Sequence, residues 1–144
     1  MADMRILLDT NVVLDAVLKR DKWLAETLVL LEAHEKGDIE AFLSANSITD
    51  VYYIVRRQTD RTVAKTSVEW CLSMFPIAPV TGQTLKTAVS LNGKDFEDNV
   101  QIACVNELGL DGIVTRDVAD FQATGISVFT PQALLTELTR RQQT

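Results

Sequence analysis

Four aspartates are the residues of this sequence best suited to chemistry. Asp9 closes a short apolar run, Asp117 follows another, and Asp50 and Asp98 lie near the starts of two predicted helices. Carboxylates brought together repel one another and raise each other's pKa unless a positive charge neutralises them. Mg²⁺ and Mn²⁺ suit that role, because both prefer oxygen ligands and keep bound waters. Such a centre activates a water and stabilises charge on a phosphoryl group, so the chemistry indicated is phosphodiester hydrolysis.

Each of these acids also has an ordinary structural explanation when it is taken alone. Asp98 lies three residues after Asp95, so it is consistent with an acid that favours the helix dipole behind an N-cap. Asp50 is consistent with a solvated acid near a helix start, and Asp117 and Asp120 with turn formation. The functional interpretation therefore depends on the four acids converging at one place.

Alternating strands and helices must position these acids. Short apolar runs predict strands at Arg5–Asp9, Ile39–Leu43, Phe75–Val80, Gly112–Thr115 and Ile126–Phe129, the third short or at an edge because it contains two prolines. Helical spacing and caps predict helices through Val12–Val17, Trp23–Lys36, Ser47–Gln58, Asp60 to about Ser73, Gln83–Leu91, Lys94–Leu108 and after Thr130-Pro131, with Gly37 and Gly109 as terminators. This pattern predicts an α/β fold whose parallel sheet is covered on both faces. Ligands of such sheets bind beyond the carboxyl ends of the strands, where Asp9 and Asp117 are expected.

The composition fits one folded domain spanning residues 1–144. With 47% apolar residues and few glycines and prolines, the 144-residue chain can bury its own core, which excludes global disorder. No apolar stretch approaches the roughly 18 residues of a membrane span, and no signal peptide is recognisable, so we expect a cytoplasmic protein without membrane contact. Cys71 and Cys104 are expected to be buried, reduced thiols.

The overall charge argues against binding a polyanion by electrostatics alone. The chain has 14 basic and 20 acidic residues, a net charge of −6. Setting the four aspartates aside leaves 16 acids against 14 bases, which is close to neutral. The excess acidity could therefore belong to one metal pocket.

Three motifs, taken in order and spacing, resemble those of the PIN-domain nucleases, and of VapC-like toxins in particular. They are Ile6–Asp15, Asp95–Asp98 and Ile113–Phe121, and the similarity extends to the closing Phe129-Thr130-Pro131. The resemblance implies a three-layer α/β/α sandwich around a parallel sheet of about five strands. It also implies a Mg²⁺- or Mn²⁺-dependent endoribonuclease that acts on single-stranded or structured RNA.

The resemblance also implies roles for individual residues. Asp9, Asp98 and Asp117 match the family's acidic metal ligands, and together with Asp50 they form the implied catalytic set. Asp50 stands where many members have glutamate, and its side chain reaches about one methylene less far, which favours a contact through water. The supporting polar residues are Asn11 and Thr115, which match positions that orient the acids, and Asp95 and Asp120, which lie close by.

The implied partners are RNA, a second copy of the chain and an antitoxin. VapC-like members usually form homodimers and are held inactive by a cognate antitoxin that lies across a helical pair. The corresponding surface here is Tyr52, Tyr53, Val55 and the region of Trp70, which is equally consistent with ordinary core packing.

Candidate RNA contacts are few. Arg116 adjoins the expected site, and Lys19 and Arg20 follow the first helix. A further basic group, comprising Arg56, Arg57, Arg61 and Lys65, is also consistent with a solvated surface. Trp23 is suited either to base stacking or to the core, and His34 is expected on the surface.

Other functions fit the residues less well. A haloacid-dehalogenase-type phosphatase needs a second acid two residues after the strand-end aspartate, where this chain has Asn11. A dinucleotide-binding fold lacks its glycine-rich turn after the first strand, and nucleophilic hydrolysis lacks a well-placed histidine. A catalytically silent PIN-like module that binds RNA or protein is the main alternative. Loss of acids would mark such a module, and all four positions here are acidic.

Overall fold

The computed structural model describes residue 2, residues 4–93 and residues 95–143. The strands among them are β1 (Met4–Leu8), β2 (Ile39–Ser44), β3 (Ile77–Ala78), β4 (Gly112–Val114) and β5 (Val128–Phe129). They form one sheet in the order β3-β2-β1-β4-β5, and each pairing is parallel. The predicted parallel sheet is confirmed, and the proline-containing segment contributes the short edge strand β3.

Helices connect the strands and cover both faces of the sheet. Those in the described ranges are α1 (Thr10–Val17), α2 (Asp21–Lys36), α3 (Ala45–Gln58), α4 (Arg61–Met74), α5 (Gly82–Val89), α6 (Phe96–Leu108) and α7 (Pro131–Gln142), with short 3-10 turns η1 (Val118–Asp120) and η2 (Gln122–Thr124). None of the helices in the described part of the chain has the length and apolar character that a membrane crossing requires.

Local capping explains where several helices begin and end. Gly37 and Gly109 adopt left-handed φ angles of 84° and 61° and terminate α2 and α6, as predicted. Asp60 and Thr130 cap α4 and α7 through their side chains, also as predicted. Lys94, the predicted first residue of α6, lies outside the described residues, and the observed helix starts at Phe96.

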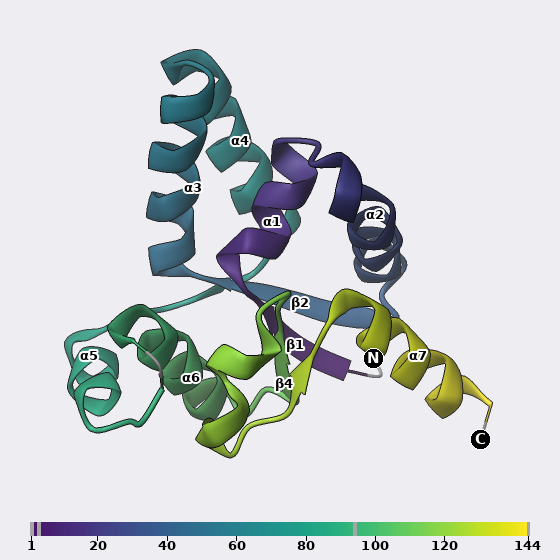
Figure 1. The fold of residues 1–144 in the computed structure, drawn as a ribbon, viewed down its shortest axis with the longest axis vertical. Coiled ribbons are helices and arrows are strands. Elements are labelled where there is room, and N and C mark those ends of the chain that lie inside the picture. Colours follow the sequence, from purple (N-terminus) through teal and green to yellow (C-terminus); the bar gives the residue numbers. More distant parts are fainter. Residues whose placement is uncertain (1, 3, 94, 144) are drawn as a thin grey trace.

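Alternation along the strands divides the core into two layers of packing. Ile6 and Leu8 of β1 contact a cluster that includes side chains of α1, α2, α3, α4 and α7, whereas Leu7 contacts a cluster with α6. Figure 1 shows the corresponding arrangement, with α5 and α6 on one side of the sheet and α1 to α4 on the other. The three-layer α/β/α architecture is therefore confirmed.

The sheet order places the candidate site. The chain runs from β1 through β2 to β3 on one side, and then returns to add β4 and β5 on the other side of β1. Such a reversal leaves a crevice beyond the carboxyl ends of the central strands. Asp9 directly follows β1, Thr115 directly follows β4, and Asp117 lies two residues beyond Thr115, so both segments leave the sheet at this edge.

One expectation about a single residue is wrong. His34 is half-buried rather than on the surface: its Nδ1 accepts from the Ala41 amide at 3.0 Å, and its Nε2 lies 2.8 Å from the Met74 carbonyl oxygen. Val55 is fully buried, which agrees with core packing, the alternative to a partner surface that the sequence left open. Local polarity along a helix gave no sign that the end of α2 meets β2 and α4. The two cysteines are buried and free, as expected.

Candidate active site

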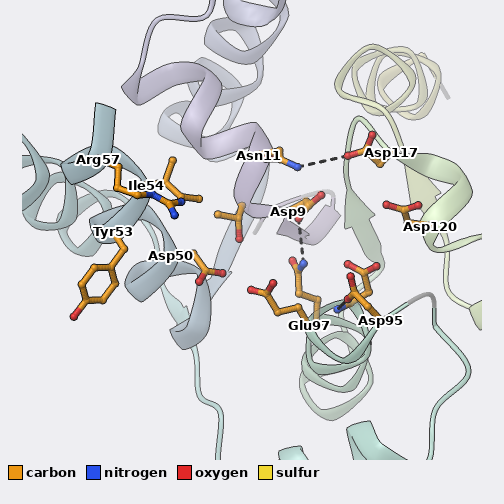
Figure 2. Close-up of a pocket in the computed structure, with 13 residues that line it drawn as sticks. Asp9, Asn11, Asp50, Tyr53, Ile54, Arg57, Asp95, Glu97, Asp117 and Asp120 are labelled. Atoms are coloured by element: carbon orange, nitrogen blue, oxygen red, sulfur yellow. Dashed lines mark hydrogen bonds between the residues drawn. The ribbon is translucent and has the colours of Figure 1, made fainter. Parts of the chain in front are cut away.

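An acidic pocket of about 540 Å³ lies at the carboxyl edge of the sheet, where α3, α6, the end of β1 and the segment after β4 meet (Figure 2). Of the thirteen described residues that line it, seven carry carboxylates: Asp9, Asp50, Asp95, Glu97, Asp98, Asp117 and Asp120. The structure therefore brings all four predicted acids to one pocket. With these seven set aside, 13 acids face 14 bases over the remaining chain, so the acidic excess is concentrated here.

Asp9 is the most enclosed of the four predicted acids and is held by two side-chain donors. Thr115 Oγ1 donates to its Oδ2 at 2.8 Å, and Gln101 Nε2 donates to its Oδ1 at 3.1 Å. Burial raises the pKa of Asp9 above its usual value, while both hydrogen bonds act in the opposite direction. The two hydrogen bonds thus fix the orientation of the Asp9 carboxylate, while its burial makes the charged form unfavourable.

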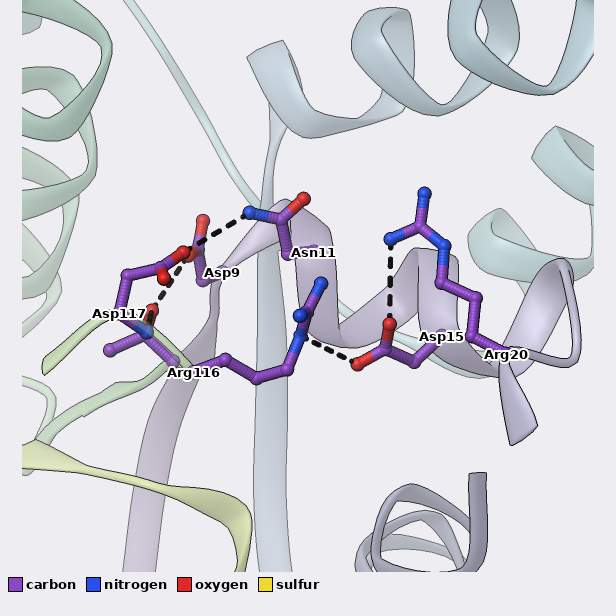
Figure 3. A network of polar contacts seen from close by, with 7 residues as sticks. Asp9, Asn11, Asp15, Arg20, Arg116 and Asp117 are labelled. Atoms are coloured by element: carbon purple, nitrogen blue, oxygen red, sulfur yellow. Dashed lines mark hydrogen bonds and ion pairs between the residues drawn. The ribbon is translucent and has the colours of Figure 1, made fainter. Parts of the chain in front are cut away.

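Asp117 is placed by the same threonine. Thr115 is fully buried, and its Oγ1 accepts a hydrogen bond from the Asp117 backbone N–H at 3.0 Å. Asn11 Nδ2 reaches Asp117 Oδ2 at 3.5 Å (Figure 3). One hydroxyl therefore connects the aspartate after β1 with the aspartate beyond β4.

The start of α6 agrees with the ordinary explanation of its acids and also places Asp98 in the pocket. Asp95 is the N-cap, and its side chain accepts from the Asp98 backbone N–H at 2.8 Å. Burial first, and then the charges of Asp95, Asp9 and Asp120, raise the pKa of Asp98 to about 7. The capping role thus belongs to Asp95, and the Asp98 carboxyl lies in the field of the other acids.

Glu97 is a pocket residue to which sequence reasoning gave no role. A hydrogen bond with Asp50 of α3, together with partial burial, raises the pKa of Glu97 to about 7. The pair joins α3 to α6 across the pocket. The available signal was the run Asp95–Asp98, in which Glu97 stands beside Asp98, but sequence alone gave no reason to pair it with Asp50.

Sequence reasoning did not place three further residues in the pocket: it gave Gln101 no role, grouped Tyr53 with the partner surface, and counted Arg57 in the basic group considered for RNA contacts. Gln101 lies three residues after Asp98 on α6, while Tyr53 and Arg57 lie three and seven residues after Asp50 on α3. Residues three, four or seven positions apart share one face of a helix. Helical spacing from the predicted acids was therefore a usable signal for all three.

The predicted RNA contacts lie elsewhere. Arg116 directs its guanidinium to the buried Asp15, with Nε 2.9 Å from Oδ2, and over the Trp23 ring at 4.6 Å from the centroid. Arg20 forms a second ion pair with Asp15 at 3.4 Å (Figure 3). Lys19 is exposed in the turn after α1. None of these three basic residues lines the acidic pocket. Arg116 instead ties the segment between Thr115 and Asp117 to α1.

The donor set fits a hard divalent cation, although the side chains are spread around the pocket. No three acidic, histidine or cysteine groups in the described ranges stand close enough together to hold one metal ion as positioned. The pocket nevertheless offers carboxylate oxygens, and the raised pKa values of Asp9 and Asp98 mean that their charged forms are disfavoured without a cation. In addition, the buried Gln101 Oε1 has no hydrogen-bond partner among the described residues. A divalent cation would offset the repulsion among these groups.

Comparisons with known proteins agree with the fold. The sequence pattern of the PIN domain matches residues 5–119. Similar solved structures include VapBC2 from Rickettsia felis bound to a promoter DNA fragment, with 15% identity, TM-score 0.71 and coverage of 88% of this chain and 98% of the other. Another is the Mycobacterium tuberculosis sarcin-ricin loop cleaving toxin VapC20, with 17% identity, TM-score 0.70 and coverage of 85% and 96%. A search of curated proteins gives no significant match.

Proposed function

The chain belongs to the PIN domain family, and on that premise we propose that it is a Mg²⁺- or Mn²⁺-dependent endoribonuclease that hydrolyses RNA phosphodiester bonds. One observation carries the proposal: Asp9, Asp50, Asp98 and Asp117 come from four separate segments and line one pocket. The seven carboxylates of that pocket would repel an RNA phosphate directly. A bound divalent cation would reverse this effect, because it adds positive charge where the phosphate must approach.

In this proposal, Asp9, Asp98 and Asp117 hold the metal directly, and Asp50 holds it through water. The cation would lower the pKa of a bound water and stabilise the charge that develops on the phosphoryl group. Thr115 and Gln101 keep the Asp9 carboxylate in one orientation, and this fixed geometry limits the rearrangement required for metal binding.

The acids around the ligands have supporting roles. Asp95 holds the first turn of α6, and thereby the position of Asp98. Asp120 adds its charge beside Asp98. Glu97 shares a hydrogen bond with Asp50, so we assign it the task of positioning this shorter acid. A cation that binds here competes with protons, since the pKa of both Asp98 and Glu97 is about 7.

Cleavage of a mixed RNA pool tests the function. We expect cleavage with Mg²⁺ or Mn²⁺, none with EDTA, and none by the Asp9→Asn variant in either metal. Asp60→Asn is the matched control: Asp60 caps α4 outside the pocket, and asparagine caps a helix equally well. Activity that survives both chelation and Asp9→Asn would refute the proposal. RNA binding without any cleavage would favour the catalytically silent module.

We also propose that the protein is the toxin of a type II toxin–antitoxin pair. The supporting observation is an apolar groove of about 420 Å³ between α1, α2 and α4, lined by Leu28, Val63 and Trp70 among others. Leu28 and Val63 are 50% and 41% exposed on this groove, and contiguous exposed apolar surface marks a site for a protein partner. Tyr53, which we had grouped with this surface, lines the acidic pocket instead.

A neighbouring reading frame that encodes a small DNA-binding protein would supply the antitoxin to test. We expect its product to co-purify with this chain and to inhibit cleavage, and Leu28→Glu to weaken both effects. Retained inhibition with this variant would exclude the groove as the antitoxin site.

We further propose that residues 1–144 form one domain and that the protein works in the cytoplasm as a homodimer. Light scattering would measure the mass of the particle in solution and so test the homodimer. The proposal of a single domain is supported by one of the two hydrophobic clusters in the described ranges, because its buried side chains come from both ends of the chain, from Met4 to Leu138.

A further inference from the structure

Helix α3 forms one wall of the acidic pocket and presents three different chemical groups along it. Asp50, Tyr53 and Arg57 all line the pocket, and Figure 2 shows them in succession along the same helix. Their spacing places them on one face over two helical turns. An acid, an exposed aromatic ring and a cation therefore follow one another from the metal-binding end of the wall outward.

Among the residues that the structure describes, Arg57 is the only basic one that lines this pocket. No ion pair or side-chain hydrogen bond in the described ranges involves its guanidinium, although seven carboxylates share the pocket. A guanidinium that is not committed to a carboxylate is available to a phosphate, which it can bind in a bidentate manner. Its neighbour Arg56 is equally exposed but does not line the pocket.

Tyr53 provides a supported aromatic surface one turn before Arg57. Its side chain is 55% exposed, and the Tyr52 ring contacts it edge to face with centroids 5.1 Å apart. This contact restricts the Tyr53 ring while leaving apolar surface accessible. Exposed aromatic rings next to a cation are the usual platform for nucleobases, and they stack only on bases that are not enclosed in a duplex.

We propose that this face of α3 binds the RNA strand beside the cleavage site, with Arg57 on a phosphate that flanks the scissile one and Tyr53 stacked on an unpaired base. The inference rests on the proposed ribonuclease function and specifies its substrate as RNA that is single-stranded at the cut. It also explains how an acidic protein binds a polyanion: the divalent cation would neutralise the scissile phosphate, and Arg57 would bind the phosphate beside it.

Binding and kinetics with a labelled single-stranded RNA test this assignment. Binding is measured in Mg²⁺ with the Asp9→Asn protein, which is not expected to cleave, and kinetics with the otherwise unaltered enzyme. Arg57→Gln should raise Kd and KM roughly tenfold with kcat little changed, because it removes binding and leaves the acids intact. It should also reduce the slope of log K against log salt by about 0.7, the value for one phosphate contact on a single strand.

Matched variants separate this role from a general loss of charge or fold. Arg56→Gln removes the same charge from the adjacent position and should leave Kd, KM and the salt slope unchanged. Arg57→Lys should keep the salt slope. Tyr53→Leu should weaken single-stranded binding roughly tenfold, within the range for one stacked base, whereas Tyr53→Phe should bind normally. The same RNA in a duplex should bind weakly, with no effect of Tyr53→Leu.

The outcomes distinguish this inference from the function on which it rests. If the unaltered enzyme cleaves RNA but Arg57→Gln behaves like Arg56→Gln, or if Tyr53→Leu binds single strands as well as Tyr53→Phe does, the α3 assignment is refuted and the ribonuclease stands. Equal cleavage of duplex and single-stranded RNA would also refute it. If the unaltered enzyme neither binds nor cleaves RNA with Mg²⁺ or Mn²⁺, both proposals fail.

Discussion

Replacing Thr115 with valine should destabilise the protein by about 3 kcal/mol at neutral pH. Valine has almost the same shape, so this fully buried site keeps its packing but loses two hydrogen bonds. The bond to the Asp9 carboxylate is worth roughly 1.5–3 kcal/mol and the bond from the Asp117 amide roughly 0.5–1.5 kcal/mol. For a domain of this size, the loss corresponds to a fall in Tm of about 6–12 °C.

The loss should depend on pH in a defined direction. The hydroxyl favours the charged form of Asp9, whose pKa burial already raises above 3.8, and its removal raises that pKa further. With Asp9 ionised, the folded state is therefore less stable in the variant than in the parent protein. The difference in unfolding free energy between Thr115→Val and the parent should be largest at pH 8 and should narrow as the pH falls and Asp9 gains a proton.

Thr27→Val is a matched control, because it makes the same substitution at a buried site where we expect no loss of stability. Its side chain is 1% exposed, and its hydroxyl has no hydrogen-bond partner among the described residues. Thr27→Val should therefore be neutral or stabilise the protein by up to about 1 kcal/mol. Urea unfolding of both variants, followed by circular dichroism at pH 5 and pH 8, measures the effects. If Thr115→Val loses no more stability than Thr27→Val does, the hydrogen bonds do not hold the site as described.

Three further predictions follow from other features of the structure. The pKa of Asp98 is raised from 3.8 to about 7, so its ionisation lowers the free energy of unfolding as the pH rises through this range. In EDTA, Asp98→Asn should therefore make Tm depend less on pH than it does in the parent protein. At pH 8, Mn²⁺ should raise the Tm of the parent protein but not that of Asp98→Asn. Burial raises the pKa of Cys71 and Cys104 to about 11, so a thiol reagent at pH 8 should label neither in the native protein and both in guanidinium, and native labelling would contradict their burial. Gly112→Ala should destabilise the protein by about 1–3 kcal/mol in urea, because the new Cβ would lie 2.5 Å from a backbone oxygen of the segment entering β5, whereas Gly82→Ala has open space and should be tolerated.

Much of the fold was predictable because its signals are local. An apolar run followed by an acid marks the end of β1 at Asp9, and a threonine followed by a proline marks the start of α7. Capping and glycine terminators act within one turn of a helix, so they can be read from neighbouring residues alone. The parallel pairing of the strands followed less directly, from the rule that apolar strands alternating with helices form a parallel sheet, whereas the order β3-β2-β1-β4-β5 came only from the structure.

The convergence of the acids was predictable for a related reason. Asp9 and Asp117 each follow a strand, and parallel strands end at one edge, so the pattern constrained both acids before any distance was known. Asp98 and Asp50 lie in the first or second turn of helices that start near this edge. The order of elements therefore carried most of the information about the predicted pocket.

The sequence by itself determined the elements, their caps and the edge at which the acids meet, because each of these depends on neighbouring residues or on chain order. Only the tertiary structure decided the partners of individual side chains: Glu97 for Asp50, Gln101 for Asp9, and Asp15 rather than the pocket for Arg116. Such choices depend on distances between elements and on the local cost of burying charge. Both quantities exist only once helices from distant parts of the chain have packed against the sheet.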